Sequence, residues 1–412
     1  MTNTPTRPAG ARPSVPSEIR VLIAAAFVIA LGFGIIAPVL PQYARSFGVG
    51  VTAASVIVSA FAFARLVFAP GGGALIVKFG ERPVYITGLL IVAVSTAAAG
   101  MAQTYEQLLL FRGLGGIGST MFTVSAMGLI VRLSPPSIRG RVSGYYATAF
   151  LTGNILGPTL GGLLAPFGYR APFFIYAVAL VIASTVVAVF LSGTSLRPKP
   201  GSIPLPDMTF REAMTDSAYR SALVSGFANG WANFGVRMAL LPMFAAAAPG
   251  LGLWTAGVAL TIFALGNAAA LQLGGRLVDS RGRKRVLILG LIVSSLATVA
   301  LGYLDHLVPF FVLSGIAGMG AGLLNPAQQA TVADVVGSER NGGKVLAYFQ
   351  MATDVGTITG PIAAGVIVDH FGYGPAFALT AAVTALAAVA WIPARETIPG
   401  GRPPRRTAVP PE

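Results

Sequence analysis

Long apolar runs separated by short polar segments dominate this chain of 412 residues. We count twelve runs of about 20 residues or more, each long enough to cross the hydrocarbon core of a bilayer as an α-helix. Helices satisfy their backbone hydrogen bonds internally, which the membrane interior requires. Only 10% of the residues are charged, whereas soluble domains have about a quarter. The sequence therefore predicts an all-α membrane protein with twelve transmembrane helices.

One long polar segment, residues 193–220, divides the predicted spans into six and six. It is rich in Pro and Ser at its start and helix-like at its end. We expect residues 19–192 and residues 221–394 to form two six-helix bundles. Residues 1–18 are expected to form a disordered tail, and residues 395–412 a basic tail. The predicted spans are residues 19–43, 52–77, 84–103, 107–131, 143–165, 171–192, 221–245, 253–277, 286–304, 308–333, 345–368 and 373–394.

The positive charges are distributed unevenly about the predicted bundle. Of the 28 Lys and Arg residues, only Arg45 and Arg170 fall in gaps on one side, three lie inside spans, and the rest lie on the other side. That richer side is cytoplasmic by the positive-inside rule, so both termini are predicted to be cytoplasmic. The basic tail can bind anionic membrane lipids. Topology thus explains the net charge of +14, and we expect no nucleic-acid partner. The chain has no Cys for a disulfide or a thiolate metal site, and we expect no cofactor.

The two halves of the chain repeat each other. Matches recur at an offset of about 200 residues: Gly80 with Gly282, Arg82 with Lys284, Gly157-Pro158 with Gly360-Pro361, and FGY at 167–169 with FGY at 371–373. Two parallel six-helix repeats about an axis along the membrane normal are typical of secondary transporters, whose site lies between the repeats near the bilayer midplane. We therefore expect a small-molecule substrate to bind between the two bundles.

Four motifs carry a family resemblance. They are G-x-L-x-D-x-x-G-R-K at 275–284, G-N-I-L-G-P-T-L-G-G at 153–162, R-G-L-G-G-I-G at 112–118 and IIAPVLPQY at 35–43. With them the chain resembles the major facilitator superfamily over nearly its whole length, and within it the twelve-span drug:proton antiporter branch. The resemblance implies a monomer in the bacterial cytoplasmic (inner) membrane that exports drugs or small amphipathic metabolites in exchange for protons by alternating access.

The loop signature is intact in the second half only, because the first copy has Val77 where the second has Asp279. In the resemblance, Asp279 meets the cytoplasmic end of span 5 near Arg139 and Arg141, where a helix N-terminus favours an anion. We expect this latch to hold the cytoplasmic side closed, with Glu81 as the candidate replacement in the first copy. The predicted gating residues are Gly275, Asp279, Gly282, Arg283 and Lys284, with Gly80 and Arg82 in the first copy.

Three glycines in predicted span 5 recur every four residues. Gly153, Gly157 and Gly161 leave one face of the helix bare, which lets a neighbouring helix approach closely. Pro158 weakens the helical hydrogen bonding near mid-span and predicts a bend. In the resemblance, spans 5 and 8 pack across the interface of the halves, so these residues are expected to form a hinge at the moving seam.

Asp354 is the one acid placed deep in a predicted span. A charge at mid-membrane costs roughly 2.5 to 3.5 kcal/mol on insertion scales, so it requires a partner or a function. Gln350 and Thr357 lie on its helical face, and in the superfamily span 11 neighbours span 2, where Arg65 lies at the centre. Asp354 is therefore either the proton-binding carboxylate or half of a permanent ion pair with Arg65. Many relatives in this branch have an acid in span 1 or 4, which this chain lacks, so the coupling mechanism stays open.

Arg112 near the outer end of span 4 either turns inward through a stripe of small residues, as its motif implies, or extends to the lipid headgroups. Polar stripes in spans 7 and 10 also suggest inward-facing surfaces, which serve either a substrate cavity or hydrogen bonds between helices. Aromatic residues in spans 1, 4 and 7 are candidates to line the cavity or to pack. The candidate cavity residues are Phe27, Phe33, Phe122, Asn229, Trp231, Asn233, Phe234, Arg237, Asn325, Gln328 and Gln329.

Other functions share some of these features. A passive facilitator, or an exporter of a sugar, a siderophore or a lipid-like compound, would have the same architecture. A multi-pass membrane enzyme is disfavoured because His306 and His370 lie on predicted external loops and no paired buried carboxylates occur. The few charges in the candidate cavity favour a neutral, amphipathic or anionic cargo.

Overall fold

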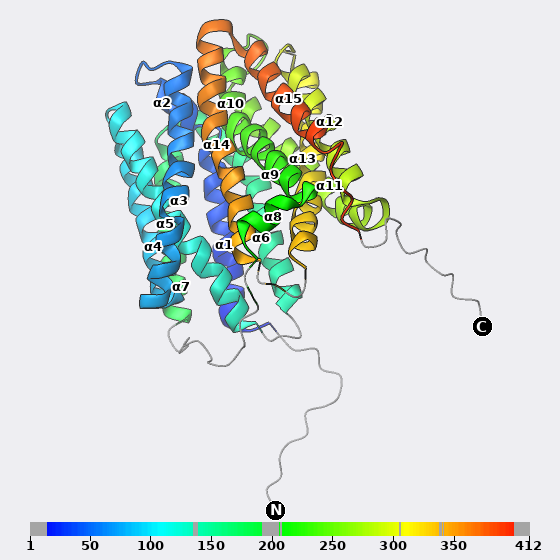
Figure 1. Cartoon of the computed structure of the whole chain (residues 1–412). Helices are drawn as coiled ribbons and strands as arrows, with labels where there is room; N and C mark the ends of the chain where they lie inside the picture. The colour runs from blue at the N-terminus through cyan, green and yellow to red at the C-terminus, as the bar shows by residue number, and fades with distance from the viewer. Residues whose placement is uncertain are drawn as a thin grey trace, which may run out of the picture.

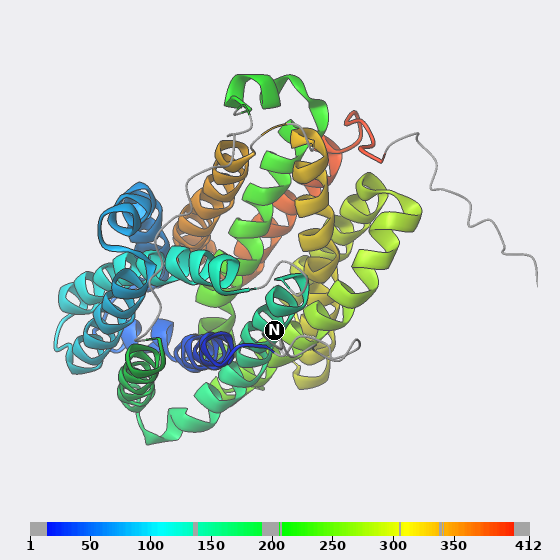
Figure 2. The ribbon, with the colours of Figure 1, turned by 90° about the horizontal axis from the view of Figure 1, so that it is seen from below.

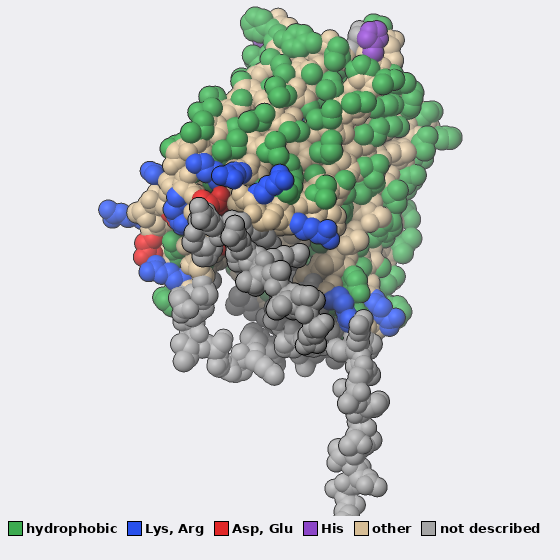
Figure 3. Space-filling model, turned by 90° about the vertical axis from the view of Figure 1, so that its right-hand side faces the viewer, with side chains coloured by type: hydrophobic (Ala, Val, Ile, Leu, Met, Phe, Trp, Pro, Cys, Tyr) green, Lys and Arg blue, Asp and Glu red, His purple; other side chains and the backbone are tan. Residues whose placement is uncertain are grey.

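The computed structural model describes residues 15–134, 139–191, 206, 208–304, 306–337, 340 and 342–398. Every regular element within these residues is helical, and the long helices run side by side in one bundle-like body (Figure 1). Ten helices in this part of the chain are long and apolar enough to cross a membrane. A broad apolar surface covers much of one face, and Lys and Arg side chains gather toward one end of it (Figure 3).

Each of the six predicted spans of the N-terminal half (residues 17–191) is helical in the structure, with ends that differ by a few residues. The first predicted span breaks after Ile36, because Pro38 and Pro41 cannot supply backbone N–H groups to a continuing helix. The elements are α1 Ser17–Ile36, α2 Leu40–Arg45, α3 Val51–Phe79, α4 Glu81–Met101, α5 Tyr105–Leu133, α6 Arg139–Leu164, the short 3-10 helix η2 Ala165–Phe167, and α7 Ala171–Phe190.

The C-terminal half (residues 208–398) contains the other six spans. A π-helix divides the helix that matches the seventh predicted span. With this divided helix and the more polar α6 added to the ten apolar helices, twelve helical segments match the twelve predicted spans. The elements are α8 Phe210–Thr215, α9 Ser217–Asn229, the π-helix η3 Gly230–Val236, α10 Arg237–Ala247, α11 Leu253–Arg281, α12 Arg283–Leu301, α13 Leu307–Val336, α14 Gly343–Phe371 and α15 Tyr373–Ala390.

Two predicted boundaries differ from the structure. The segment predicted as a linker up to residue 220 already forms helix α8, which a reciprocal capping box between Thr209 and Glu212 starts, and helix α9. The predicted basic tail begins with residues 395–398, which fold back onto the helices as described below. Residues 1–14 and 399–412 lie outside the described residues.

The internal repeat is visible in the backbone at its glycine anchors. Gly80 and Gly282 join consecutive helices with positive φ angles of 83° and 99°, and Gly168 and Gly372 do so with 99° and 86°. Only glycine adopts this conformation at low cost, which explains why these positions match between the halves. Helix α3 packs against α14, and α6 packs against α11, so these two seams join the halves (Figure 2).

Candidate transport site and gates

The α3–α14 seam is held by polar contacts at the end of the molecule opposite the start of α1 and the end of α15. We call this the far end, and the other the terminal end. The Asp369 carboxylate of α14 accepts hydrogen bonds from the backbone N–H groups of Val51 and Thr52, each at 2.9 Å, and from Thr52 Oγ1 at 2.6 Å. Further along the seam, Ser59 Oγ donates to the Ile358 carbonyl at 2.7 Å.

The α6–α11 seam is also tight in its far half, but it is closed by close packing. Thr159 Oγ1 and Thr261 Oγ1 are 2.7 Å apart, and Thr261 Oγ1 donates to the Ile155 carbonyl at 2.8 Å. Gly162 and Gly257 face each other, and a methyl group built on Gly162 would lie 3.3 Å from the Cα of Gly257. Small residues at this crossing allow the two backbones to approach.

The terminal-end segments of α6 and α14 are exposed. In α6, residues 143–145, 147 and 148 are all exposed. Successive helical residues point about 100° apart, so these exposed residues surround most of the helix. A helix that faced lipid on one side alone would expose a narrower stripe. In α14, residues 346–348, 350 and 351 show the same pattern. The halves are therefore packed at the far end and separated toward the terminal end.

Asp354 lies half-buried on the exposed part of α14. Its Oδ1 accepts a hydrogen bond from Gln350 Nε2 at 3.1 Å, as their shared helical face predicts. Arg65 lies close enough for its charge to act on Asp354, but the two side chains form neither an ion pair nor a hydrogen bond in the described structure. Arg65 and Asp354 therefore face each other across the seam without contact in this conformation.

Arg112 points into the N-terminal half. Its side chain is only 7% exposed, and its guanidinium lies 4.7 Å from the ring centroid of Phe61 in α3. Tyr176 of α7 lies nearby. Among the described residues, no hydrogen-bond acceptor reaches Arg112 Nε. The alternative in which Arg112 extends to the lipid headgroups is therefore wrong for this conformation, because such a side chain would be exposed.

Arg237 makes a similar contact in the C-terminal half. It is 2% exposed, lies 4.4 Å from the ring centroid of Phe263 in α11, and donates to Thr298 Oγ1 at 3.3 Å. Its Nε and Nη1 have no hydrogen-bond partner among the described residues. Phe61 and Phe263 occupy matching positions of the repeat, yet the two arginines come from helices that do not match, α5 and α10. Each half thus buries one guanidinium against the ring at the matching position, and neither guanidinium has a carboxylate partner among the described residues.

The polar stripe of span 7 is buried beside the π-helix η3. Asn233 Nδ2 donates to Asn229 Oδ1 at 2.8 Å, and Gln328 Nε2 of α13 donates to Ser225 Oγ at 3.0 Å. A π-helix shifts the side chains that follow it around the helix axis and often marks a functional segment. Of the α13 amides, which lie on one helical face, Gln328 is buried, Asn325 is half-buried and Gln329 is exposed.

Two of the predicted cavity aromatics are occupied by packing. Phe122 contacts Tyr85 of α4 edge-on, with ring centroids 6.3 Å apart. Trp231 is buried, and its Nε1 donates to Thr380 Oγ1 at 3.4 Å. The remaining three are more accessible. Phe33 packs beside Phe61, below the Arg112 guanidinium, while Phe27 is half-buried and Phe234 is exposed.

The glycine stripe of α6 packs against α1 in its own half. A methyl group on Gly157 would lie 2.5 Å from the Leu31 carbonyl oxygen and 2.7 Å from the Gly34 Cα. Gly153 and Gly161 meet the α1 backbone in the same way. The prediction of a bare face for close packing is confirmed, whereas contact with the moving seam comes from other residues of α6, including Thr159.

Matching cations bind the ends of matching helices. Arg82 Nη2 donates to the Ala188 carbonyl in the last turn of α7 at 2.7 Å, and Lys284 Nζ donates to the Ile392 carbonyl just after α15 at 2.6 Å. The last carbonyls of a helix lack partners within the helix and carry partial negative charge, so a cation there is stabilising. The gating-loop cations thus tie the third helix of each half to its sixth.

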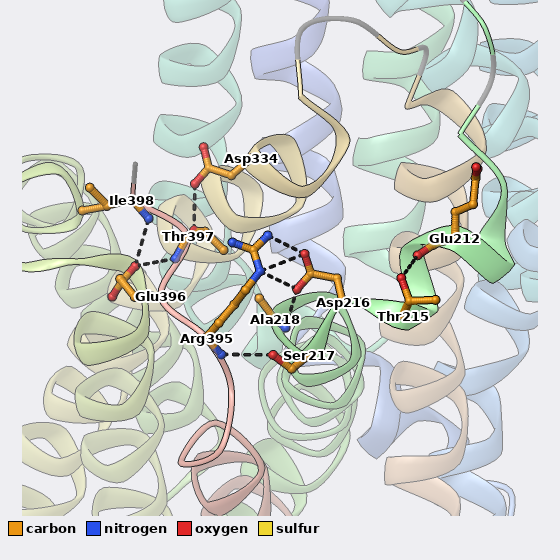
Figure 4. Close-up of polar contacts among 10 residues, drawn as sticks. All are labelled: Glu212, Thr215, Asp216, Ser217, Ala218, Asp334, Arg395, Glu396, Thr397 and Ile398. Atoms are coloured by element: carbon orange, nitrogen blue, oxygen red, sulfur yellow. Dashed lines mark hydrogen bonds and ion pairs between the residues drawn. The ribbon is translucent and has the colours of Figure 1, made fainter. Parts of the chain in front are cut away.

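The C-terminal segment binds the start of α12 and the end of α13. Figure 4 shows the second of these contacts, between Thr397 and Asp334. The Glu396 carboxylate accepts from the backbone N–H groups of Arg283 at 3.0 Å and Lys284 at 3.2 Å, which caps α12. Arg283 Nε pairs with Asp334 at 2.6 Å, and Thr397 Oγ1 donates to Asp334 at 2.8 Å. Arg283 therefore contacts its own half through Asp334.

Arg395 joins the same segment to the start of α9. Its guanidinium pairs with the Asp216 carboxylate through Nε and Nη2, and its backbone N–H donates to Ser217 Oγ at 3.1 Å (Figure 4). Partial burial acts to raise the pKa of Asp216, but hydrogen bonds from Arg395 and from the Ala218 N–H outweigh it and leave the pKa below its usual value. We call residues 395–398 with these partners the C-terminal brace.

Comparison with known proteins identifies the family. The model of the Major Facilitator Superfamily matches residues 22–258 and residues 222–411. The chain belongs to this superfamily. It is therefore a membrane transporter and not an enzyme. It is 26% identical over 380 residues to "Multidrug resistance protein 1" of Bacillus subtilis, covering 90% of this chain and 96% of that protein. It is also 33% identical over 174 residues to "Quinolone resistance protein NorA" of Staphylococcus aureus, covering 42% of this chain and 45% of that protein.

Solved structures share the fold of this superfamily member. A bacterial homologue of the human lysosomal transporter Spinster, in an inward-facing and unoccupied conformation, matches with a TM-score of 0.72 at 17% identity, covering 92% of this chain and 96% of that one. A POT family transporter in complex with 5-aminolevulinic acid matches with a TM-score of 0.77 at 10% identity, covering 91% and 95%. At these identities the likeness concerns the fold alone.

Sequence reasoning missed three carboxylates that bind helix ends or cations in this transporter. Asp369, Glu396 and Asp334 lie close to predicted span ends, where the sequence offers no direct sign of their partners. The sequence held one indirect signal for the Asp369 contact. The glycine before α3 offers that helix no side-chain cap, so an acceptor must come from elsewhere. The side chains of Asp279 and Arg139 lie outside the described residues, so the predicted Asp279 latch stays a prediction.

Proposed function

We propose that this transporter exports drugs or small amphipathic molecules by alternating access, coupled to proton entry. The observation that carries the proposal is Asp354, a half-buried carboxylate on the seam helix α14 that has a neutral partner, Gln350, and no contact with Arg65. A carboxylate in that setting is free to change its protonation state. The names of the Bacillus subtilis and Staphylococcus aureus relatives support export of drugs as the class of transport.

The terminal end is the cytoplasmic end in this proposal. Lys and Arg side chains gather there, and the positive-inside rule places such a surface in the cytoplasm (Figure 3). Both termini are then cytoplasmic, and the protein lies in the inner membrane. The conformation, packed at the far end and exposed at the terminal end, is open to the cytoplasm.

Proton coupling follows from what rocking of the halves does to Asp354. Burial away from water favours a neutral carboxyl, and an approaching cation favours a carboxylate. Helix α14 carries Asp354 and α3 carries Arg65, so the two move relative to each other when the α3–α14 seam closes at the cytoplasmic end. Closure at the cytoplasmic end removes Asp354 from cytoplasmic water and favours the neutral carboxyl, which takes up a proton from the external side. Opening at the cytoplasmic end exposes the carboxyl to water, which favours the carboxylate and releases the proton into the cytoplasm.

The cargo is proposed to be neutral or anionic. Arg112 and Arg237 are buried without a carboxylate partner among the described residues, and Asp354 is balanced by Arg65 nearby. A cationic cargo would add to this uncompensated positive charge, which the low-dielectric interior makes costly. Competition for transport by an amphipathic amide and by the corresponding carboxylate would show whether the site prefers a neutral or an anionic cargo.

The test is uptake into liposomes that contain the purified protein. With an acidic interior, a fluoroquinolone should accumulate above its external concentration, and dissipating the pH gradient should abolish the accumulation. Protein-free liposomes under the same gradient correct for passive trapping of the drug. Uptake that only equilibrates, with a rate independent of the gradient, would instead show a passive facilitator.

A further inference from the structure

Helix α3 begins without a side-chain cap of its own. Its N-cap residue is Gly50, so the first backbone N–H groups, on Val51 and Thr52, have no local side-chain acceptor. Asp369 accepts both at 2.9 Å and also binds Thr52 Oγ1 at 2.6 Å. A carboxylate at a helix N-terminus satisfies these donors and interacts favourably with the helix dipole. Asp369 is thus the N-terminal cap of α3.

This cap comes from the other half of the molecule. Asp369 lies in the last turn of α14, more than 300 residues away along the chain. Three other helices are capped locally: Thr104 caps α5, Thr209 caps α8 and Asp216 caps α9. The cap of α12 by Glu396 is distant along the chain but stays within one half. A local cap persists when the halves rock, whereas the cap from Asp369 must break when α3 and α14 part at the far end.

The second seam lacks an equivalent. Gly252 stands before α11 as Gly50 stands before α3, but Thr255 bonds to Gly252 locally, at 3.3 Å through the backbone N–H and 2.6 Å through the carbonyl. In the internal repeat, Trp254 stands at the position that matches Thr52. Residues 165–167 match the region of Asp369 and contain no acid. Among the described residues, the carboxylate clasp therefore occurs at one seam of the repeat.

We propose that Asp369 is a gating residue that stabilises the conformation closed at the far end, and that release of its cap on α3 is the step that opens this end. The inference rests on the alternating-access mechanism proposed above. Among the described residues, the hydrogen bonds of Asp369 to the rest of the molecule go to the start of α3 and not to Asp354, so it acts as a positioning residue that sets the ratio of the two open states. Removing the clasp should favour the state that is open at the far end.

The absence of Cys makes the test direct, since a single introduced Cys is the only labelling site. Ser55 is fully buried in the far half of the α3–α14 seam, so Ser55→Cys should react with a membrane-impermeant maleimide mainly when that end opens. Adding Asp369→Ala should raise the labelling rate about fivefold, the ratio that corresponds to a helix cap of about 1 kcal/mol. Thr52→Val, which removes one of three hydrogen bonds, should raise it less.

Asp216→Ala is the matched control, because Asp216 caps α9 within one half and its loss should leave the labelling rate unchanged. Gly50→Ala provides a second route that keeps the carboxylate, since the added methyl group would lie 3.1 Å from Asp369 Oδ2 and should loosen the clasp. An unchanged or slower rate in both Asp369→Ala and Gly50→Ala would overturn the proposal. Labelling needs neither substrate nor a proton gradient, so this result is independent of whether transport is proton-coupled.

Discussion

The contact between α6 and α1 predicts a sharp difference between two glycines on one helix. In Gly157→Ala the new methyl group would lie 2.5 Å from the Leu31 carbonyl oxygen and 2.7 Å from the Gly34 Cα. Both are backbone atoms of α1, so no side-chain rotation relieves the overlap. The helices must separate by about 1 Å to restore ordinary contact distances, and overpacking of this kind costs roughly 1 to 3 kcal/mol.

Gly144 on the same helix provides the control. A methyl group there meets nothing within 4 Å, so Gly144→Ala should stabilise the helix by about 0.5 to 1 kcal/mol through propensity alone. The melting temperature of the purified protein should therefore fall for Gly157→Ala and stay level or rise for Gly144→Ala. If Gly157→Ala is as stable as Gly144→Ala, α1 and α6 are not in close contact, and the account of the glycine stripe is refuted.

Two further perturbations test the brace and the buried cation. Arg395→Ala should lower the melting temperature at neutral pH. Because the pKa of Asp216 is lowered in the folded state, its contribution exists above the usual value of 3.8 and disappears as the pH falls through the folded value, so the variant and wild type should converge in acid. Arg237→Met should raise the melting temperature, since it removes a buried guanidinium that lacks a carboxylate partner, and should weaken competition by an amphipathic carboxylate more than by its amide. A loss of stability in Arg237→Met would mean that the guanidinium is compensated.

The fold was predictable from the sequence because its signals are local. Apolar length specifies the spans, and glycines such as Gly80 and Gly282 recur because their positive φ angles exclude other residues. Pro38 indicates the break after α1, but the apolar run continues past it, so the two segments were predicted as one span. The π-helix η3 was not, because inserting one residue into a helical turn leaves no periodic signature.

The candidate site was less predictable because its contacts are distant along the chain. The sequence placed Arg112 and Arg237 inside spans, but the rings they face, Phe61 and Phe263, belong to other helices. Aromatic residues such as Trp231 have the same helical spacing whether they line a cavity or pack. Asp369 is an extreme case, since its partners lie in the opposite half and only the three-dimensional structure brings them together.

The most direct test of the central claim is transport by Asp354→Asn. In liposomes with an acidic interior, wild type should accumulate a fluoroquinolone, whereas Asp354→Asn should lose gradient-driven accumulation and retain exchange of labelled for unlabelled drug without a gradient. That result would show that the halves still alternate while the proton is no longer carried. Undiminished gradient-driven accumulation by Asp354→Asn would contradict the account.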